Sequence, residues 1–187
     1  MADKGRSYIV FVDETGFMLA PVLRRTWAPR GETPIIKVSE PHGRISVIGA
    51  LALRQDPTRF AFYFHLLQDN ANFNGKSVAK FVEHIRQLLD GPITLLWDEY
   101  CIHRAKPVKE YLRKNPSIRA EEFPPYAPEL NPVDYVWSYV KYGRLANYCP
   151  HGLPELRQRI TAELASVAEQ PRLLRGLFSR TGLRLED

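Results

Sequence analysis

Residues 93–99 read Ile-Thr-Leu-Leu-Trp-Asp-Glu, an apolar run that ends abruptly in two carboxylates. Residues 8–14 have the same arrangement, Tyr-Ile-Val-Phe-Val followed by Asp13 and Glu14. Short runs rich in β-branched and aromatic residues are typical of buried strands. In parallel or mixed α/β sheets, functional groups collect just past the carboxyl ends of strands. If these two strands are parallel neighbours, Asp13 and Asp98 therefore lie side by side.

The rest of the chain alternates between strand and helix patterns. Three further strands are expected at residues 44–53, 59–67 and 118–123, the first two joined by a polar hairpin connection at 54–58. Helices are expected behind the N-cap Asn74 up to Gly91-Pro92, and then at residues 106–114, 132–147, 154–169 and 171–184. This order predicts an α/β fold, a mixed five-stranded sheet flanked by helices.

The segment from Arg24 to Lys37 carries Trp27, Pro29, Gly31 and Pro34, and predicts a short irregular hairpin. Trp27 has two interpretations. It could stack on a nucleic-acid base, but packing of the hairpin against the core is the simpler expectation.

Composition excludes several classes of protein. The 187 residues are 44% hydrophobic and 25% charged, with only two cysteines, which excludes a disordered chain and a disulfide scaffold. The polar N-terminus lacks the apolar region of a secretory signal, and no apolar stretch approaches the ~20 residues that a membrane helix needs. We expect a soluble cytoplasmic protein. Its net charge of +5 permits a nucleic-acid partner without requiring one.

A third acid follows a proline-rich loop. In residues 123–137, Phe-Pro-Pro-Tyr-Ala-Pro-Glu-Leu-Asn-Pro-Val-Asp-Tyr-Val-Trp, Asn131 is a natural N-cap and Pro132 a natural first helical residue. Asp134 then lies in the first turn, where the helix dipole stabilises a carboxylate. A well-capped helix accounts for Asp134 alone, and single acids after strands are common turn residues. Neighbouring carboxylates, however, need a cation between them, and oxygen ligands suit Mg²⁺ or Mn²⁺.

Four motifs together resemble the catalytic domain of DDE/D transposases, in particular the mariner-like superfamily and its bacterial insertion-sequence relatives. They are FVDETG (11–16), TWAPRGETP (26–34), LLWDEYCIHRAK (95–106) and FPPYAPELNPVDYVW (123–137). The resemblance covers residues 8–148 and implies an RNase H-like fold. It also implies a metal-binding catalytic triad of Asp13, Asp98 and Asp134 with two Mg²⁺ or Mn²⁺ ions, which cleaves and joins DNA strands at insertion-sequence ends.

The sequence departs from the family pattern at three places. Glu99 stands where the family usually has Asn, and the third acid, often Glu, is Asp134. The first strand begins within eight residues of Met1, so we expect no helix-turn-helix recognition region. The chain is then a single catalytic domain, residues 1–187, with a core at 8–148 and C-terminal helices at 152–184. DNA, a second copy of the chain and a separate helix-turn-helix protein are its expected partners.

Basic and aromatic residues near the acids are candidates for DNA contact, although each could equally lie on an ordinary solvated surface. The candidates are Arg24, Arg25, Trp27, Arg30, Lys37, His103, Arg104, Lys106, Lys109, Arg113 and Lys114. A purely structural histidine at position 103 is at least as well supported. Two other functions stay open: a transposase remnant that binds DNA or a partner without cutting, and an RNase H-like nuclease without transposition.

Overall fold

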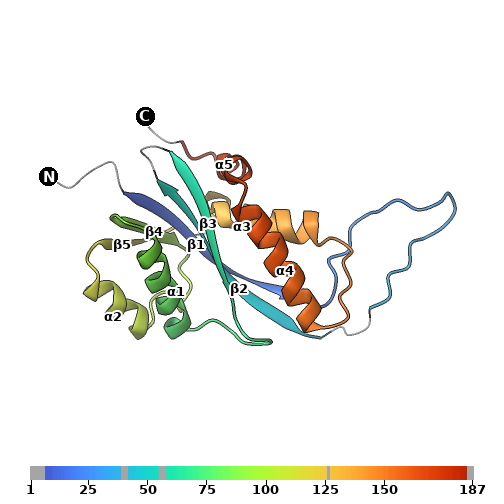
Figure 1. Cartoon of the computed structure of the whole chain (residues 1–187), viewed down its shortest axis with the longest axis horizontal. Coiled ribbons are helices and arrows are strands. Elements are labelled where there is room, and N and C mark those ends of the chain that lie inside the picture. The colour runs from blue at the N-terminus through green and yellow to red at the C-terminus, as the bar shows by residue number, and fades with distance from the viewer. Residues whose placement is uncertain (1–6, 39–41, 55–57, 126, 185–187) are drawn as a thin grey trace.

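The computed structural model describes residues 7–38, 42–54, 58–125 and 127–184. Five strands form one sheet in the order β3-β2-β1-β4-β5 (Figure 1). The strands are β1 (Tyr8–Met18), β2 (Arg44–Arg54), β3 (Arg59–Leu66), β4 (Ile93–Trp97) and β5 (Ile118–Glu122). β1, β2 and β3 pair antiparallel, whereas β4 pairs parallel with both β1 and β5. The predicted mixed sheet is confirmed, and so is the parallel pairing of the two strands that precede acids.

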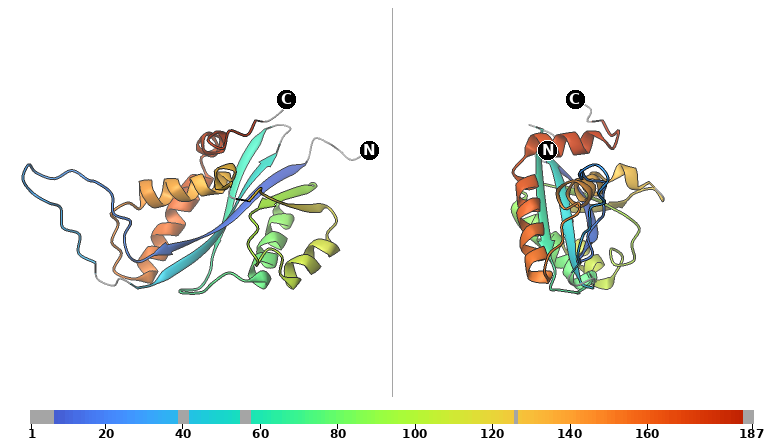
Figure 2. Two further views of the ribbon diagram at one scale, coloured as in Figure 1. Left: turned by 180° about the vertical axis from the view of Figure 1, so that it is seen from behind. Right: turned by 90° about the vertical axis from the view of Figure 1, so that its right-hand side faces the viewer.

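Helices cover both faces of this sheet (Figure 2). α1 (Gly75–Leu88) and α2 (Lys106–Lys114) pack on one face; α3 (Pro132–Ser138), α4 (Leu153–Ala168) and α5 (Pro171–Ser179) pack on the other. Side chains of a strand point alternately to the two faces. In β1, accordingly, Val10 and Val12 belong to the core under α1, and Phe11 to the core under α3. The same alternation places Asp13 on the α3 face and Glu14 on the α1 face.

β1 is longer than the sequence predicts. The expected strand ends at Asp13, but β1 continues to Met18 because β2 pairs with it along its whole length, from Tyr8↔Arg54 to Met18↔Arg44. The parallel pairing with β4 stops at Phe11↔Leu96. Asp13 therefore lies where β1 extends beyond its parallel neighbour and not, as predicted, at the end of its strand. An antiparallel partner satisfies backbone hydrogen bonds whatever the side chains are.

The N-cap predicted for α1 is present, but two predicted helices end earlier than expected, and residues 171–184 are α-helical only to Ser179. The Asn74 side chain accepts hydrogen bonds from the backbone N–H groups of Lys76 and Ser77, at 2.9 and 3.1 Å, and starts α1. Leu156, Ile160, Leu164 and Val167 of α4 are buried against the sheet, as their spacing indicates. The predicted helix 132–147 is α-helical only to Ser138. It continues as a π-helical segment, η3 (Tyr139–Arg144), and a short 3-10 turn, η2 (Pro128–Leu130), precedes it.

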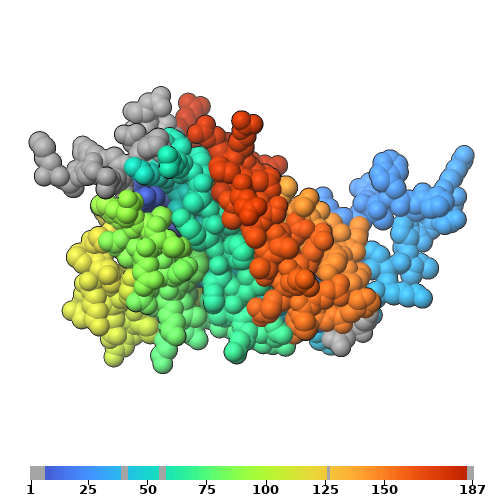
Figure 3. Space-filling model, viewed as in Figure 1, coloured from blue at the N-terminus to red at the C-terminus, as the bar shows by residue number. Residues whose placement is uncertain are grey.

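Residues 20–38 form a projecting loop between β1 and β2 that extends away from the rest of the molecule (Figures 1 and 3). The predicted hairpin is wrong, because no residue of this loop is in a strand. Pro21, Pro29 and Pro34 have no backbone N–H to give to a ladder. The expected packing of Trp27 on the core is also wrong, since its side chain is 99% exposed.

Within the described residues, no helix is both long enough and apolar enough to cross a bilayer. Residues 55–57 of the expected β2–β3 connection lie outside the described part of the chain.

Candidate active site

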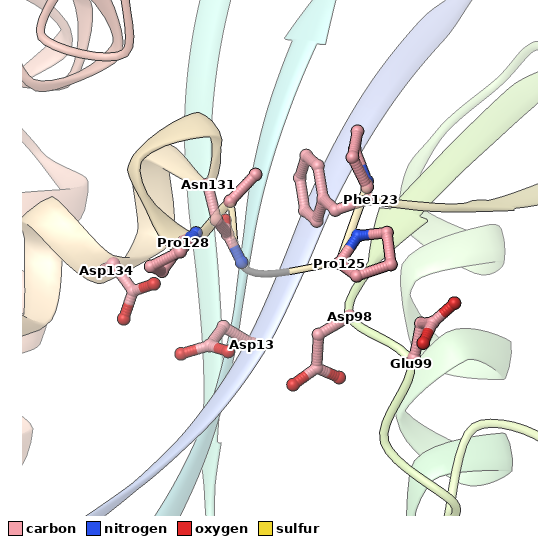
Figure 4. Close-up of a pocket in the computed structure, with 10 residues that line it drawn as sticks. Asp13, Asp98, Glu99, Phe123, Pro125, Pro128, Asn131 and Asp134 are labelled. Atoms are coloured by element: carbon pink, nitrogen blue, oxygen red, sulfur yellow. The ribbon is translucent and has the colours of Figure 1, made fainter.

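Asp13, Asp98 and Asp134 line one open cleft of about 400 Å³. Figure 4 shows Asp13 between the other two, with Phe123, Pro125 and Pro128 of the proline-rich loop along the opposite wall. The three acids are far apart in the sequence and come from β1, from the loop after β4 and from the first turn of α3. The structure thus brings together the three acids that the motifs single out.

Asp13 is held by a tryptophan of α3. The indole Nε1 of Trp137 donates a 2.7 Å hydrogen bond to Oδ2 of Asp13. The indole has room because Gly49, the partner of Asp13 in β2, has no side chain. A Cβ at Gly49 would lie 2.6 Å from the Trp137 ring. Burial, with repulsion from Asp134 and Glu14, raises the pKa of Asp13 well above its ordinary value.

Asp134 is placed by the N-terminus of α3. The buried Asn131 side chain accepts from the backbone N–H of Val133 at 3.1 Å and donates from Nδ2 to the Val12 carbonyl at 3.2 Å. The cap therefore also ties the start of α3 to β1, one residue before Asp13. Burial and repulsion from Asp98 raise the pKa of Asp134, and Lys141 opposes the shift.

Asp98 has a different environment. Its side chain is 58% exposed, and its Oδ1 accepts from the backbone N–H of Tyr100 at 3.1 Å and lies 3.1 Å from Nδ1 of His103. The hydrogen bond from His103 is the main cause of an Asp98 pKa below the ordinary value. Two acids of the cleft are thus disfavoured as anions, and the third is favoured.

His103 lies beneath this cleft and not on the surface. It is 3% exposed and stacks on the Trp97 ring, with centroids 4.6 Å apart. Its Nδ1 donates to the Asp98 carbonyl at 3.0 Å, and its Nε2 lies 3.2 Å from Oε1 of Glu14. Burial alone would lower the His103 pKa, but the hydrogen bonds to Asp98 and Glu14 raise it to about 10. Both ring nitrogens contact protein groups, so the geometry fits the structural interpretation of His103 better than a contact with DNA.

Glu99 points away from the other acids. It lines the cleft beyond Asp98 (Figure 4), and its Oε1 lies 3.5 Å from a guanidinium nitrogen of Arg104. Arg104 also binds Glu122, with Nε 2.7 Å from Oε1. Of the predicted DNA contacts in this region, Arg104 is thus engaged with two carboxylates, and Lys106 lies 3.8 Å from Glu110.

Of the other predicted DNA contacts, Lys109, Arg113 and Lys114 are exposed on α2, and the rest belong to the projecting loop. Arg24, Arg25, Trp27 and Arg30 are exposed, as is Lys37. The base of the loop is fixed where Asn147 accepts from the Arg24 backbone N–H at 2.8 Å and donates to its carbonyl at 3.0 Å. The structure does not bring these residues into the cleft.

Three residues next to the acids were not predicted as site residues: Glu14, Trp137 and Lys141. Lys141 donates to Thr15 Oγ1 at 2.5 Å, and the negative charges of Asp13 and Asp134 favour its protonated form. Lys141 follows Asp134 by two helical turns, a spacing that indicates a shared helix face. Trp137 similarly follows Asp134 by three residues. For Glu14, the signal is its position next to Asp13 on the opposite face of β1.

Across the described ranges, no three His, Cys, Asp or Glu side chains are close enough together to hold a metal ion as they stand. Anionic groups at close range repel one another unless a cation intervenes. Burial is the main cause of the raised pKa values of Asp13 and Asp134, and repulsion between the acids raises them further.

Comparison with known proteins identifies the family. Residues 8–152 match the family described as DDE superfamily endonuclease. A protein of insertion element IS630 from Shigella sonnei, described as an uncharacterized 39 kDa protein, is 22% identical over 168 residues. That match covers 87% of this chain and 46% of the relative, so the chain spans about half the length of the curated protein it matches.

Solved structures of the Mos1 mariner transposase are similar in fold. Its paired end complex with Mn superposes with a TM-score of 0.65 at 16% identity, covering 93% of this chain and 53% of that one. Its catalytic domain superposes with a TM-score of 0.54 at 15% identity, covering 98% and 86%. The expected RNase H-like architecture is thereby confirmed. With Asp13, Asp98 and Asp134 lining one cleft on this fold and the family match covering residues 8–152, the chain belongs to the DDE superfamily endonucleases.

Proposed function

We propose that this chain is the catalytic domain of a transposase that cleaves and joins DNA strands at the ends of an insertion sequence. One observation carries the proposal: Asp13, Asp98 and Asp134, from three separate elements, line the same cleft. The family match and the likeness to the IS630 protein and to Mos1 support it.

The three acids are the proposed ligands of Mg²⁺ or Mn²⁺. Carboxylate oxygens suit these hard cations. Repulsion between the acids contributes, after burial, to the raised pKa values of Asp13 and Asp134, and a bound cation would relieve it. We propose two ions per site, which Asp13, Asp98 and Asp134 would hold; Asp13 lies between the other two acids (Figure 4). Ions bound in this way would activate a water or a 3′-hydroxyl and stabilise the leaving oxygen of an in-line displacement.

The residues of the chain itself provide orientation. Trp137 and Asn131 hold the Asp13–Asp134 half of the cleft through hydrogen bonds of 2.7 and 3.2 Å. Lys141 adds a positive charge next to both acids. Arg104 draws Glu99 outward, so the acid at the position where the family usually has Asn does not join the other three.

The projecting loop is the proposed DNA contact outside the cleft. Its cations Arg24, Arg25 and Arg30 are exposed and can reach phosphates, and the fully exposed Trp27 can stack on a base. Arg104 and Lys106 are proposed to line the path of the DNA near Asp98. Since two transposon ends must be handled together, we propose a homodimer on DNA, with end recognition by a separate helix-turn-helix protein or region.

The test measures metal binding and strand cleavage together. Calorimetry with Mn²⁺ on the wild type and Asp98→Asn is paired with nicking of supercoiled plasmid and with joining of a 3′-OH end to target DNA. The proposal expects all three signals from the wild type and none from the variant. Nicking without joining would instead indicate a nuclease that does not transpose. DNA binding with neither metal binding nor nicking would indicate a remnant.

A further inference from the structure

Glu14 lies next to Asp13 in β1 but on the opposite face of the sheet. Asp13 bonds to Trp137 of α3, whereas Glu14 contacts His103 in the loop after β4. Both oxygens of Glu14 are within reach of His103 Nε2, at 3.2 and 3.3 Å, and its side chain is largely buried. Glu14 is thus not placed among the proposed metal ligands.

His103 joins Glu14 to Asp98. Its second ring nitrogen, Nδ1, contacts both the carbonyl oxygen and the carboxylate of Asp98, at 3.0 and 3.1 Å. The ring stacks on Trp97, with centroids 4.6 Å apart, and lies at right angles to the Tyr100 ring at 6.2 Å. These contacts and the bonds at both nitrogens fix the orientation of the His103 ring, and with it the position of the Asp98 groups bonded to Nδ1.

The connection lies where the sheet no longer links the two strands. The parallel register of β1 and β4 ends at Phe11↔Leu96, two residues before Asp98. Beyond that point the loop turns back on itself, with the His103 N–H bonded to the Tyr100 carbonyl at 3.0 Å and the Arg104 N–H to Cys101 at 3.2 Å. The Glu14–His103 pair therefore spans from β1 to the loop just past the point where their ladder ends.

We propose that Glu14 and His103 form a clasp that sets the position of Asp98 relative to Asp13, and thereby the affinity of the cleft for divalent metal. The inference rests on the proposed function and makes both side chains positioning residues. A buried ionic pair is a costly way to join two elements, because apolar residues of similar volume would stabilise them at least as well. What the pair adds is a fixed orientation of Asp98, as hydrogen bonds to the metal ligands provide in metalloenzymes.

The test compares Mn²⁺ affinity, by calorimetry, in the wild type and four variants. Glu14→Ala and His103→Ala are expected to weaken binding about 10- to 100-fold, the usual effect of losing such a partner. Glu14→Gln keeps an acceptor oxygen for Nε2 and is expected to restore affinity to within about threefold of the wild type. His84→Ala, at an exposed position on α1, is the matched control and should bind like the wild type.

Hydrogen exchange of metal-free protein measures the clasp independently of the proposed function. Amides of residues 98–105 should lose protection in Glu14→Ala and His103→Ala but keep it in Glu14→Gln. Protection of the β4 amides should be unchanged in all three variants. This readout decides the matter even if the wild type binds no metal, in which case the proposed function fails separately. Wild-type affinity in both alanine variants would overturn the clasp, as would equal losses in Glu14→Ala and Glu14→Gln. Unchanged exchange in residues 98–105 would also overturn it.

Discussion

The cleft and the projecting loop are opposites in packing and in charge. The cleft collects carboxylates on elements fixed by buried contacts, such as Trp137 on Asp13 and Asn131 on β1. The loop carries arginines and an exposed tryptophan on a backbone outside any strand. Acids that must hold cations at fixed positions need a rigid support, whereas contacts to a DNA backbone tolerate an adaptable one. The proposed chemistry and the proposed DNA contact therefore lie in different parts of the chain, and substitutions should separate them.

Asp13→Asn is expected to separate strand cleavage from DNA binding more strongly than any other substitution. Nicking should fall by ~10³-fold or more, since an essential acid is removed, while DNA binding through the loop is retained. Without metal the variant should be more stable than the wild type, because the buried, repelled carboxylate is gone and Asn still accepts from Trp137. A rise in Tm of about 2–4 °C corresponds to roughly 1 kcal/mol in a protein of this size. Calorimetric melting with and without Mg²⁺ checks both parts. A lower Tm in the metal-free variant would contradict the expectation that the Asp13 carboxylate destabilises the folded chain.

The stability of the metal-free protein and the metal affinity of the cleft should depend on pH in opposite directions. Folding raises the pKa of Asp13 and Asp134, so their contribution to stability is present while they are protonated and is lost as the pH rises through the raised values. Metal-free protein should thus lose stability as the pH rises from the ordinary pKa of aspartate through the raised values, and Mg²⁺ should reverse the loss. Mn²⁺ affinity should instead rise with pH, by on the order of tenfold per pH unit, as long as binding must displace a proton from Asp13. In Asp13→Asn both slopes should flatten; slopes equal to those of the wild type would assign the titration to other groups.

A smaller effect is expected from Trp137→Phe, which removes the N–H donor to Asp13. That donor lowers the Asp13 pKa, so its loss raises the pKa further and should weaken Mn²⁺ binding at neutral pH about tenfold. Phe62→Leu is the matched control, since Phe62 packs edge-on against Trp137, with centroids 5.9 Å apart, and its side chain has no donor for Asp13. The control should lower Tm and leave Mn²⁺ affinity unchanged. Equal affinity losses in both variants would mean that packing, and not the hydrogen bond, maintains the site.

The proximity of Asp13 and Asp98 could be predicted because its signals are local, whereas Asp134 was placed with them only by the family resemblance. Apolar runs defined β1 and β4, and the Asn131-Pro132 pair defined the start of α3 beside Asp134. The continuation of β1 to Met18 could not be predicted, because it depends on pairing with β2 and not on the polar residues 13–16 themselves. The π-helical turn after Ser138 likewise has no counterpart in the apolar spacing.

The exposure of Trp27 and the burial of His103 could not be predicted either. Trp27 is the kind of residue that usually packs, and its exposure depends on where the projecting loop runs. His103 resembles a surface residue in a basic stretch, and its burial depends on Glu14, which is 89 positions away in the sequence. Neither outcome follows from neighbouring residues, since each is decided by tertiary contacts.

The smallest effect is expected in the loop. Arg30→Gln should weaken DNA binding only a few-fold and reduce the salt dependence of binding by about one phosphate contact. Mn²⁺ affinity should not change, and stability should stay within about 0.5 kcal/mol because the residue is exposed. Fluorescence anisotropy over a range of salt concentrations measures the slope, with Arg172→Gln on the exposed surface of α5 as the control. If Arg30→Gln altered metal binding, the loop and the cleft would be coupled. If its salt slope matched that of the control, the arginine would be an ordinary solvated side chain, and DNA contact would have to be sought nearer to the cleft.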